Sequence, residues 1–122
     1  MNLSSILRAA EGERKRRVTR VPVSLRESYE AAWFLARTLR ARVRGLRIMV
    51  GDDANGMHHW LENRTLYIDP TAPAAAMVGR IGDENYAYKN AVPSGFSPGE
   101  PRDHPRYVYA PETADSQFLN LE

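Results

Sequence analysis

The strongest hydrophobic pattern in the chain lies between residues 24 and 43. Apolar residues recur there three or four positions apart and form one stripe along a helix. The stripe consists of Ala32, Leu35, Ala36, Leu39 and Val43. Ser24 and Glu27 have the spacing of a capping box, in which each side chain bonds the backbone N–H of the other residue. We therefore predict one long helix from Ser24 to about Val43, with Ser28 at the head of its buried stripe.

Short extended patterns follow this helix. Leu46–Val50 is an apolar strand candidate, and residues 51–56 are rich in turn formers. Residues 58–62 and 67–71 indicate two strands joined by a tight turn and predict a hairpin around Asn63-Arg64. The expected fold class is α+β, with one long N-terminal helix packed on a small antiparallel sheet.

Further elements are expected toward the C-terminus. Thr71–Val78 has a cap residue and a proline in its first turn, which favours a second helix. Tyr86–Tyr88 and Tyr107–Tyr109 are short strand candidates separated by a proline- and glycine-rich loop. Residues 24–122 are expected to form a single α+β domain, preceded by a basic arm at residues 1–23. The arm is expected to begin with a short helix around Leu3–Ala10.

The predicted hairpin also carries the candidate chemistry. If the strands pair around residues 63 and 64, Trp60 lies opposite Tyr67 and His58 lies opposite Asp69. A carboxylate beside a histidine orients the imidazole and supports its charged form, as a general base requires. His58 and His59 diverge on a strand and cannot share one metal ion, so no metal site is predicted.

Three segments in order resemble the transglutaminase-like branch of the papain-like cysteine peptidase fold. They are Ser28 with its Ala- and Leu-rich helix leading to the strand that ends at Gly51, then His58–Glu62, then Ile68–Thr71. The resemblance implies a thiol-type amide hydrolase or acyl transferase that acts on a protein or peptide. Position 28 would attack the carbonyl, His58 would act as base and then acid, and Asp69 would orient His58. It further implies that Trp60 contacts the substrate and that no cofactor is needed.

Position 28 departs from this family, because the chain contains no cysteine and Ser28 stands where the nucleophilic cysteine would be. Three explanations are open: a cysteine replaced by serine, a natural homologue that kept only binding, or a working serine nucleophile. A helix N-terminus and an imidazolium can ionise a thiol, but a serine hydroxyl is far too basic for that route. Little or no activity is expected of the chain as written, so its status as an enzyme is left open.

Charge supports an alternative class of function. A basic cluster in the arm consists of Arg14, Lys15, Arg16, Arg17 and Arg20. The alternative is a non-catalytic interaction protein that binds a protein partner or nucleic acid through this arm and the helix. Nucleic acid is not favoured, because 17 basic residues face 15 acidic ones and the net charge is only +2.

Composition limits the remaining possibilities. A chain of 122 residues is expected to form one domain. The absence of cysteine excludes disulfides and cysteine-based zinc sites. No apolar run approaches the ~20 residues that a membrane span needs, and the N-terminal residues lack the apolar core of a signal peptide. A cytoplasmic protein without a membrane partner is expected, while its oligomeric state is open.

Overall fold

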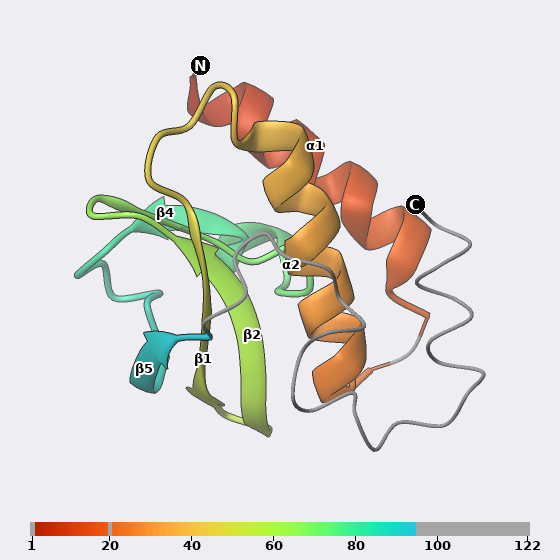
Figure 1. Ribbon diagram of the computed structural model, residues 1–122. Helices are drawn as coiled ribbons and strands as arrows, with labels where there is room; N and C mark the ends of the chain where they lie inside the picture. Colours follow the sequence, from red (N-terminus) through yellow and green to blue (C-terminus); the bar gives the residue numbers. More distant parts are fainter. Residues whose placement is uncertain (1, 20, 95–122) are drawn as a thin grey trace.

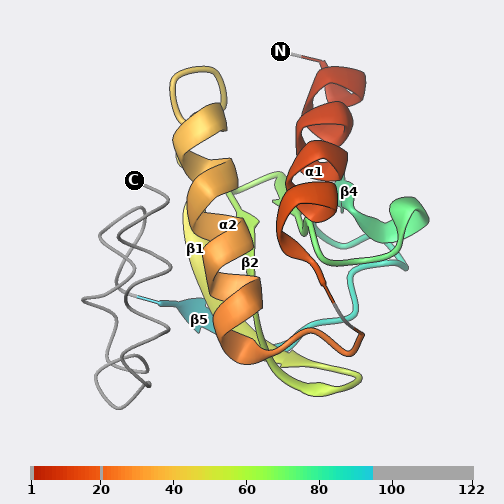
Figure 2. The ribbon, with the colours of Figure 1, turned by 90° about the vertical axis from the view of Figure 1, so that its right-hand side faces the viewer.

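The computed structural model describes residues 2–19 and 21–94, which form two helices packed on one face of a five-stranded sheet (Figure 1). The helices are α1 (Leu3–Arg17) and α2 (Leu25–Leu39). They lie side by side over the sheet, as the second view shows (Figure 2). The predicted α+β class is confirmed. The prediction of a single long helix is wrong, because α1 forms a second helix of the same length as α2, 15 residues.

The sheet is antiparallel throughout and has the strand order β4-β3-β2-β1-β5. Its strands are β1 (Arg47–Asp53), β2 (Gly56–Glu62), β3 (Leu66–Ile68), β4 (Val78–Arg80) and β5 (Lys89–Pro93). The long β1–β2 hairpin forms its centre, and β3 adds to the outer edge of β2. A short 3₁₀ helix, η1 (Ala74–Ala76), precedes β4.

Helix α2 begins as the sequence predicts. Ser24 and Glu27 form the complete capping box, and the predicted stripe is buried against the sheet. The helix ends at Leu39, four residues earlier than expected, because the chain turns there to enter β1. Gly45 has a φ of +71° in this connection, a left-handed conformation that glycine adopts at little cost.

Helix α1 belongs to the hydrophobic core. Ile6 and Ala10 are buried against α2, and the helix continues to Arg17 instead of ending near residue 10. The basic run stays helical because the carboxylate of Glu13 accepts hydrogen bonds from Arg16 and Arg17, one turn further along. The expected arm at residues 1–23 is therefore largely a packed helix over its described part.

The two faces of the sheet carry different cores. Ile48, Leu61 and Ile68 face the helices. Met49, Trp60 and Tyr67 lie on the opposite face, where Tyr86 and Tyr88 of the segment before β5 and Ala91 of β5 pack against them. The segment before β5 is not a strand, so the prediction of a strand at residues 86–88 is wrong. The aromatic side chains are used there for packing.

Two other expectations concern segments that follow β3 in the chain. The predicted helix over residues 71–78 reduces to η1 followed by β4, because β4 pairs with β3 and completes that edge of the sheet. The strand candidate Tyr107–Tyr109 lies outside the described residues.

Candidate functional site: the cleft around His58

His58 and Asp69 form a buried pair on the sheet face opposite the helices. His58 Nε2 lies 2.8 Å from Asp69 Oδ2. The register differs from the predicted one, since Glu62 pairs with Tyr67 instead of Thr65. This difference of two residues keeps every side chain on its face of the sheet, because strand side chains alternate with a period of two. The expected contact is therefore present although the expected register is wrong.

Asp69 is the centre of the hydrogen-bond network. Besides His58, it accepts bonds from the Thr71 backbone N–H at 2.9 Å, from the Thr71 hydroxyl at 2.7 Å and from the Tyr88 hydroxyl. Burial alone would raise the pKa of Asp69, but the bond and charge of His58, with the Tyr88 and Thr71 bonds, outweigh burial and lower it. Asp69 is thus held ionised inside the protein.

His58 has the complementary shift. Burial alone would lower its pKa, but the Asp69 carboxylate raises it, with a further contribution from Asp53. Its second nitrogen, Nδ1, lies 3.6 Å from Asp53 Oδ2. The imidazole is therefore held between two carboxylates, which favour its charged form.

Trp60 supports the site from within the core. It is fully buried, and its expected contact with a substrate stays a prediction. Its ring stacks on Tyr88 with centroids 3.9 Å apart, and its Nε1 donates to Glu62 at 2.8 Å. Tyr88 keeps its proton, because burial and the neighbouring Asp69 raise the pKa of its phenol. Trp60 thus holds Tyr88 where it donates to Asp69.

A cleft of about 310 Å³ opens onto the pair. Its polar residues include His58, Asp69, Asp53, Thr71, Tyr88 and the amides Asn55 and Asn85. Its apolar residues come mainly from the segment before α2 and from the approach to β4. The apolar residues are Val21, Pro22, Val23, Ala54, Met57, Ala72, Pro73, Ala76 and Ala87. The cleft thus combines a charged floor with apolar walls.

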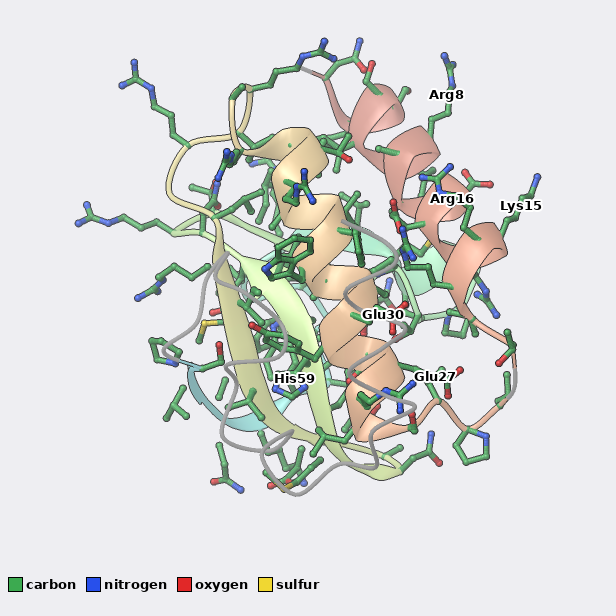
Figure 3. The ribbon with its side chains drawn as sticks, turned by 45° about the vertical axis from the view of Figure 1, so that its right-hand side comes forward. Arg8, Lys15, Arg16, Glu27, Glu30 and His59 are labelled. Carbon is green, nitrogen blue, oxygen red and sulfur yellow. The ribbon has the colours of Figure 1, made fainter. Side chains whose placement is uncertain are left out.

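Ser28 does not reach this cleft. Its hydroxyl donates to Leu25 O at 2.8 Å, accepts from the His59 backbone N–H at 3.1 Å and lies 3.5 Å from His59 Nδ1. Helix α2 covers the face of β2 to which His59 points, and His59 lies beside the N-terminal half of that helix (Figure 3). Neighbouring strand residues point to opposite faces, so His58 points away from Ser28. The structure brings His58 and Asp69 together and separates Ser28 from them.

The arginines of the basic cluster of α1 largely pair with other groups of the protein. Arg14 donates to the Ala72 carbonyl, and Arg16 and Arg17 pair with Glu13. Arg17 also lies over the ring of Phe34 at 3.7 Å. Lys15 is exposed, and Arg20 lies outside the described residues. These contacts leave few charges of this cluster for an external partner.

Three residues of the site were not predicted from the sequence as part of it. Thr71 belongs to the Asp-Pro-Thr segment, and its proximity to Asp69 was a usable signal. No such signal marked Tyr88 or Asp53 in the sequence, because Tyr88 comes from the segment before β5 and Asp53 from the end of β1. Within residues 2–19 and 21–94, no group of three or more metal-ligating side chains is arranged to hold a metal ion. No helix in the described part of the chain has the length and apolarity needed to cross a membrane.

The resemblance to the transglutaminase-like proteins rests only on the segments of this chain named above. No family model, curated protein or solved structure matches this chain.

Proposed function

We propose that the chain is a non-catalytic relative of the papain-like, transglutaminase-like proteins and binds an amide-bearing peptide segment in the His58 cleft. One observation carries the proposal: the ionised His58–Asp69 pair lines a cleft, while the hydroxyl of Ser28 lies on the other face of the sheet. The segments that carry the resemblance, His58–Glu62 and Ile68–Thr71, both contribute to this pair.

Nucleophilic catalysis lacks its attacking group in this arrangement. Covalent catalysis needs a hydroxyl or thiol within hydrogen-bond reach of its base. The cleft lining in the described residues includes no serine, and its Thr71 and Tyr88 hydroxyls both donate to Asp69. The nitrogen of His58 nearest to Thr71 is Nε2, which already faces Asp69. The pair is therefore suited to holding a ligand.

The chemistry of the cleft matches an amide. An imidazolium Nδ1–H can donate to a carbonyl oxygen, and the nearby Asp53 carboxylate can accept from an amide N–H. A donor and an acceptor side by side complement the two ends of one amide group. The apolar walls add contact surface for the attached chain.

The direct test is an NMR titration of the protein with the blocked amino acid N-acetylglutamine methylamide, combined with an assay for released ammonia. We expect millimolar binding, shift changes confined to the cleft residues, loss of binding in His58→Gln and no ammonia. Lys89→Gln is the matched control and should bind normally, because Lys89 is exposed on β5. Absence of shift changes in the wild type would overturn the binding proposal, and His58-dependent ammonia release would overturn the non-catalytic one.

A second test addresses position 28 directly. Because the chain has no cysteine, Ser28→Cys and Val23→Cys each introduce a single thiol. The thiol at 28 should react slowly with iodoacetamide and be indifferent to His58→Gln, since Ser28 is fully buried. The thiol at 23, on the cleft wall, should react faster. Rapid labelling of the thiol at position 28 that requires His58 would show that this position can act as a nucleophile.

A further inference from the structure

Exposed arginines gather where α2 ends and β1 begins, and the β2–β3 turn adds another. We call this group the arginine end. It consists of Arg40, Arg42, Arg44, Arg47 and Arg64. The chain has no acidic residue between Glu30 and Asp52, so no carboxylate from the surrounding helix and strand interrupts the group. The result is a concentration of positive charge that the net charge of +2 conceals.

These charges are not neutralised within the described residues. None of the five arginines has a carboxylate oxygen within 4.0 Å of its guanidinium nitrogens there. Glu62 pairs with Arg47 in the register, but its carboxylate accepts from Trp60 Nε1 and the Tyr86 hydroxyl instead. The acids of α2, Glu27 and Glu30, lie in the other half of that helix (Figure 3). Charge is therefore separated along the molecule.

A hollow of about 450 Å³ lies within the arginine end. Its lining consists of Arg44, Gly45, Arg47, Asn63, Arg64 and Thr65, with no carboxylate among them. The hollow lies between the α2–β1 connection and the β2–β3 turn, two segments that run close together (Figure 1).

Asn63 fixes the shape of this hollow. Its amide Nδ2 donates to the Arg44 carbonyl at 3.0 Å and so ties the two segments together. Its Oδ1 accepts from the Thr65 and Leu66 backbone N–H groups at 2.9 and 2.8 Å, which closes the turn. These hydrogen bonds therefore hold in place the two backbone segments that carry the arginines of the hollow.

We propose that the arginine end binds the phosphate backbone of nucleic acid. All five cations are arginine, whose planar guanidinium bonds phosphate oxygens in pairs. Arg40 and Arg42 lie outside the lining of the hollow, so the group extends beyond one phosphate and suits a chain of them. The lining has no aromatic residue to stack on a base, so binding is to the backbone and independent of sequence. It also offers no exposed large apolar side chain for insertion into a lipid surface.

The site is independent of the proposed amide cleft. Arg47 pairs with Glu62 at one end of the β1–β2 hairpin, whereas His58 pairs with Gly51 toward the other end. His58→Gln should therefore leave nucleic-acid binding unchanged. It also differs from the basic cluster of α1, whose arginines are largely engaged within the protein.

The test is fluorescence anisotropy with a labelled DNA duplex of about 20 base pairs and arbitrary sequence, over a series of salt concentrations. The wild type is compared with Arg42→Gln/Arg44→Gln/Arg64→Gln. The matched control, Arg8→Gln/Lys15→Gln/Lys89→Gln, removes the same charge from exposed positions elsewhere. We expect the arginine-end variant to bind roughly tenfold or more weakly at low salt, and its salt slope to fall by about 0.9 for each phosphate that it no longer neutralises. The control should bind almost as tightly as the wild type.

Four outcomes would overturn the proposal. They are no binding by the folded wild type, equally weakened binding in the two triple variants, binding of inorganic phosphate but not of the duplex, and binding of phosphatidylserine vesicles but not of the duplex. Circular dichroism and thermal unfolding of both variants establish that each is folded. All substituted positions are exposed, so both are expected to fold.

Discussion

At the scale of single residues, His58 and Asp69 form a buried charged pair in the described part of this protein. Each member lowers the cost of burying the other, because an ion pair with additional hydrogen bonds compensates for lost hydration. Thr71 and Tyr88 supply those additional bonds. Since the pKa of His58 is raised and that of Asp69 is lowered, the pair makes the stability of the protein depend on pH.

We predict that the stability lost in His58→Gln is largest between about pH 4 and pH 6.5, the ordinary aspartate and histidine pKa values. The His58 contribution is complete below its unfolded pKa and disappears as pH rises through the raised folded pKa. The Asp69 contribution is present above its unfolded pKa and disappears as pH falls through the lowered folded pKa. Urea unfolding of both proteins at several pH values measures the difference.

Asp83→Asn is the control for this experiment, because Asp83 is exposed and accepts only from a nearby backbone N–H in the described residues. Its stability difference should vary little over the same pH range. A His58→Gln difference that is constant with pH would mean that the pair is not ionised in the folded protein.

At the scale of elements, the β1–β2 hairpin determines both sites. Successive side chains of β2 point to opposite faces of the sheet, so His58 and Trp60 lie on one face and His59 and Leu61 on the other. Gly51 is the point of closest approach in this hairpin, since a Cβ there would lie 2.7 Å from the Lys89 carbonyl and 2.9 Å from the Trp60 ring. The packing of β5 and Trp60 therefore requires glycine at position 51.

We predict that Gly51→Ala lowers the free energy of unfolding by about 1–3 kcal/mol, the usual cost of overpacking a core. The added methyl must displace either the β5 backbone or the ring on which Tyr88 stacks. Chemical denaturation gives the change, and Trp fluorescence reports on the ring. Gly56→Ala is a less crowded comparison, because a Cβ there meets nothing within 4 Å, although its φ of +113° adds backbone strain. Unchanged stability in Gly51→Ala would contradict the close approach.

At the scale of the whole molecule, the described residues form two layers with separated charge. Helix α1 completes the helical layer, since Ile6 and Ala10 join the core that α2 shares with the sheet. The arginine end lies where α2 enters β1, and most acids of the helices lie elsewhere. The cleft lies where the sheet meets the end of α1 and the α1–α2 connection, since Arg14 and residues 21–23 line it together with His58.

We predict that Ile6→Ala lowers the free energy of unfolding by roughly 2–4 kcal/mol, as truncation of a buried residue does. Ile6 is 2% exposed and packs in the core. A freely moving N-terminal arm would show no such loss. Guanidinium unfolding compares this variant with Leu3→Ala, whose side chain is 48% exposed and should cost much less. Equal, small effects would mean that α1 does not pack on α2 in solution.

Local pattern alone determined a large part of what the structure contains. The capping box, the buried stripe of α2, the pairing of β2 with β3 and the contact between His58 and Asp69 all follow from spacing and side-chain periodicity within short segments. They could be predicted because helix and strand periods act between near neighbours in the chain. The shift of the hairpin register by two residues left the facing of each side chain intact for the same reason.

Only the tertiary structure decided the remaining features. Ser28 and His58 are separated because α2 packs on the face of β2 opposite His58, a choice that neither segment encodes alone. The packing of α1, the burial of Trp60 beneath Tyr88 and the gathering of the arginines likewise depend on interactions between distant segments. Net charge sums over the chain, whereas binding depends on where the charges lie, and folding places unpaired arginines together at one end of the described molecule.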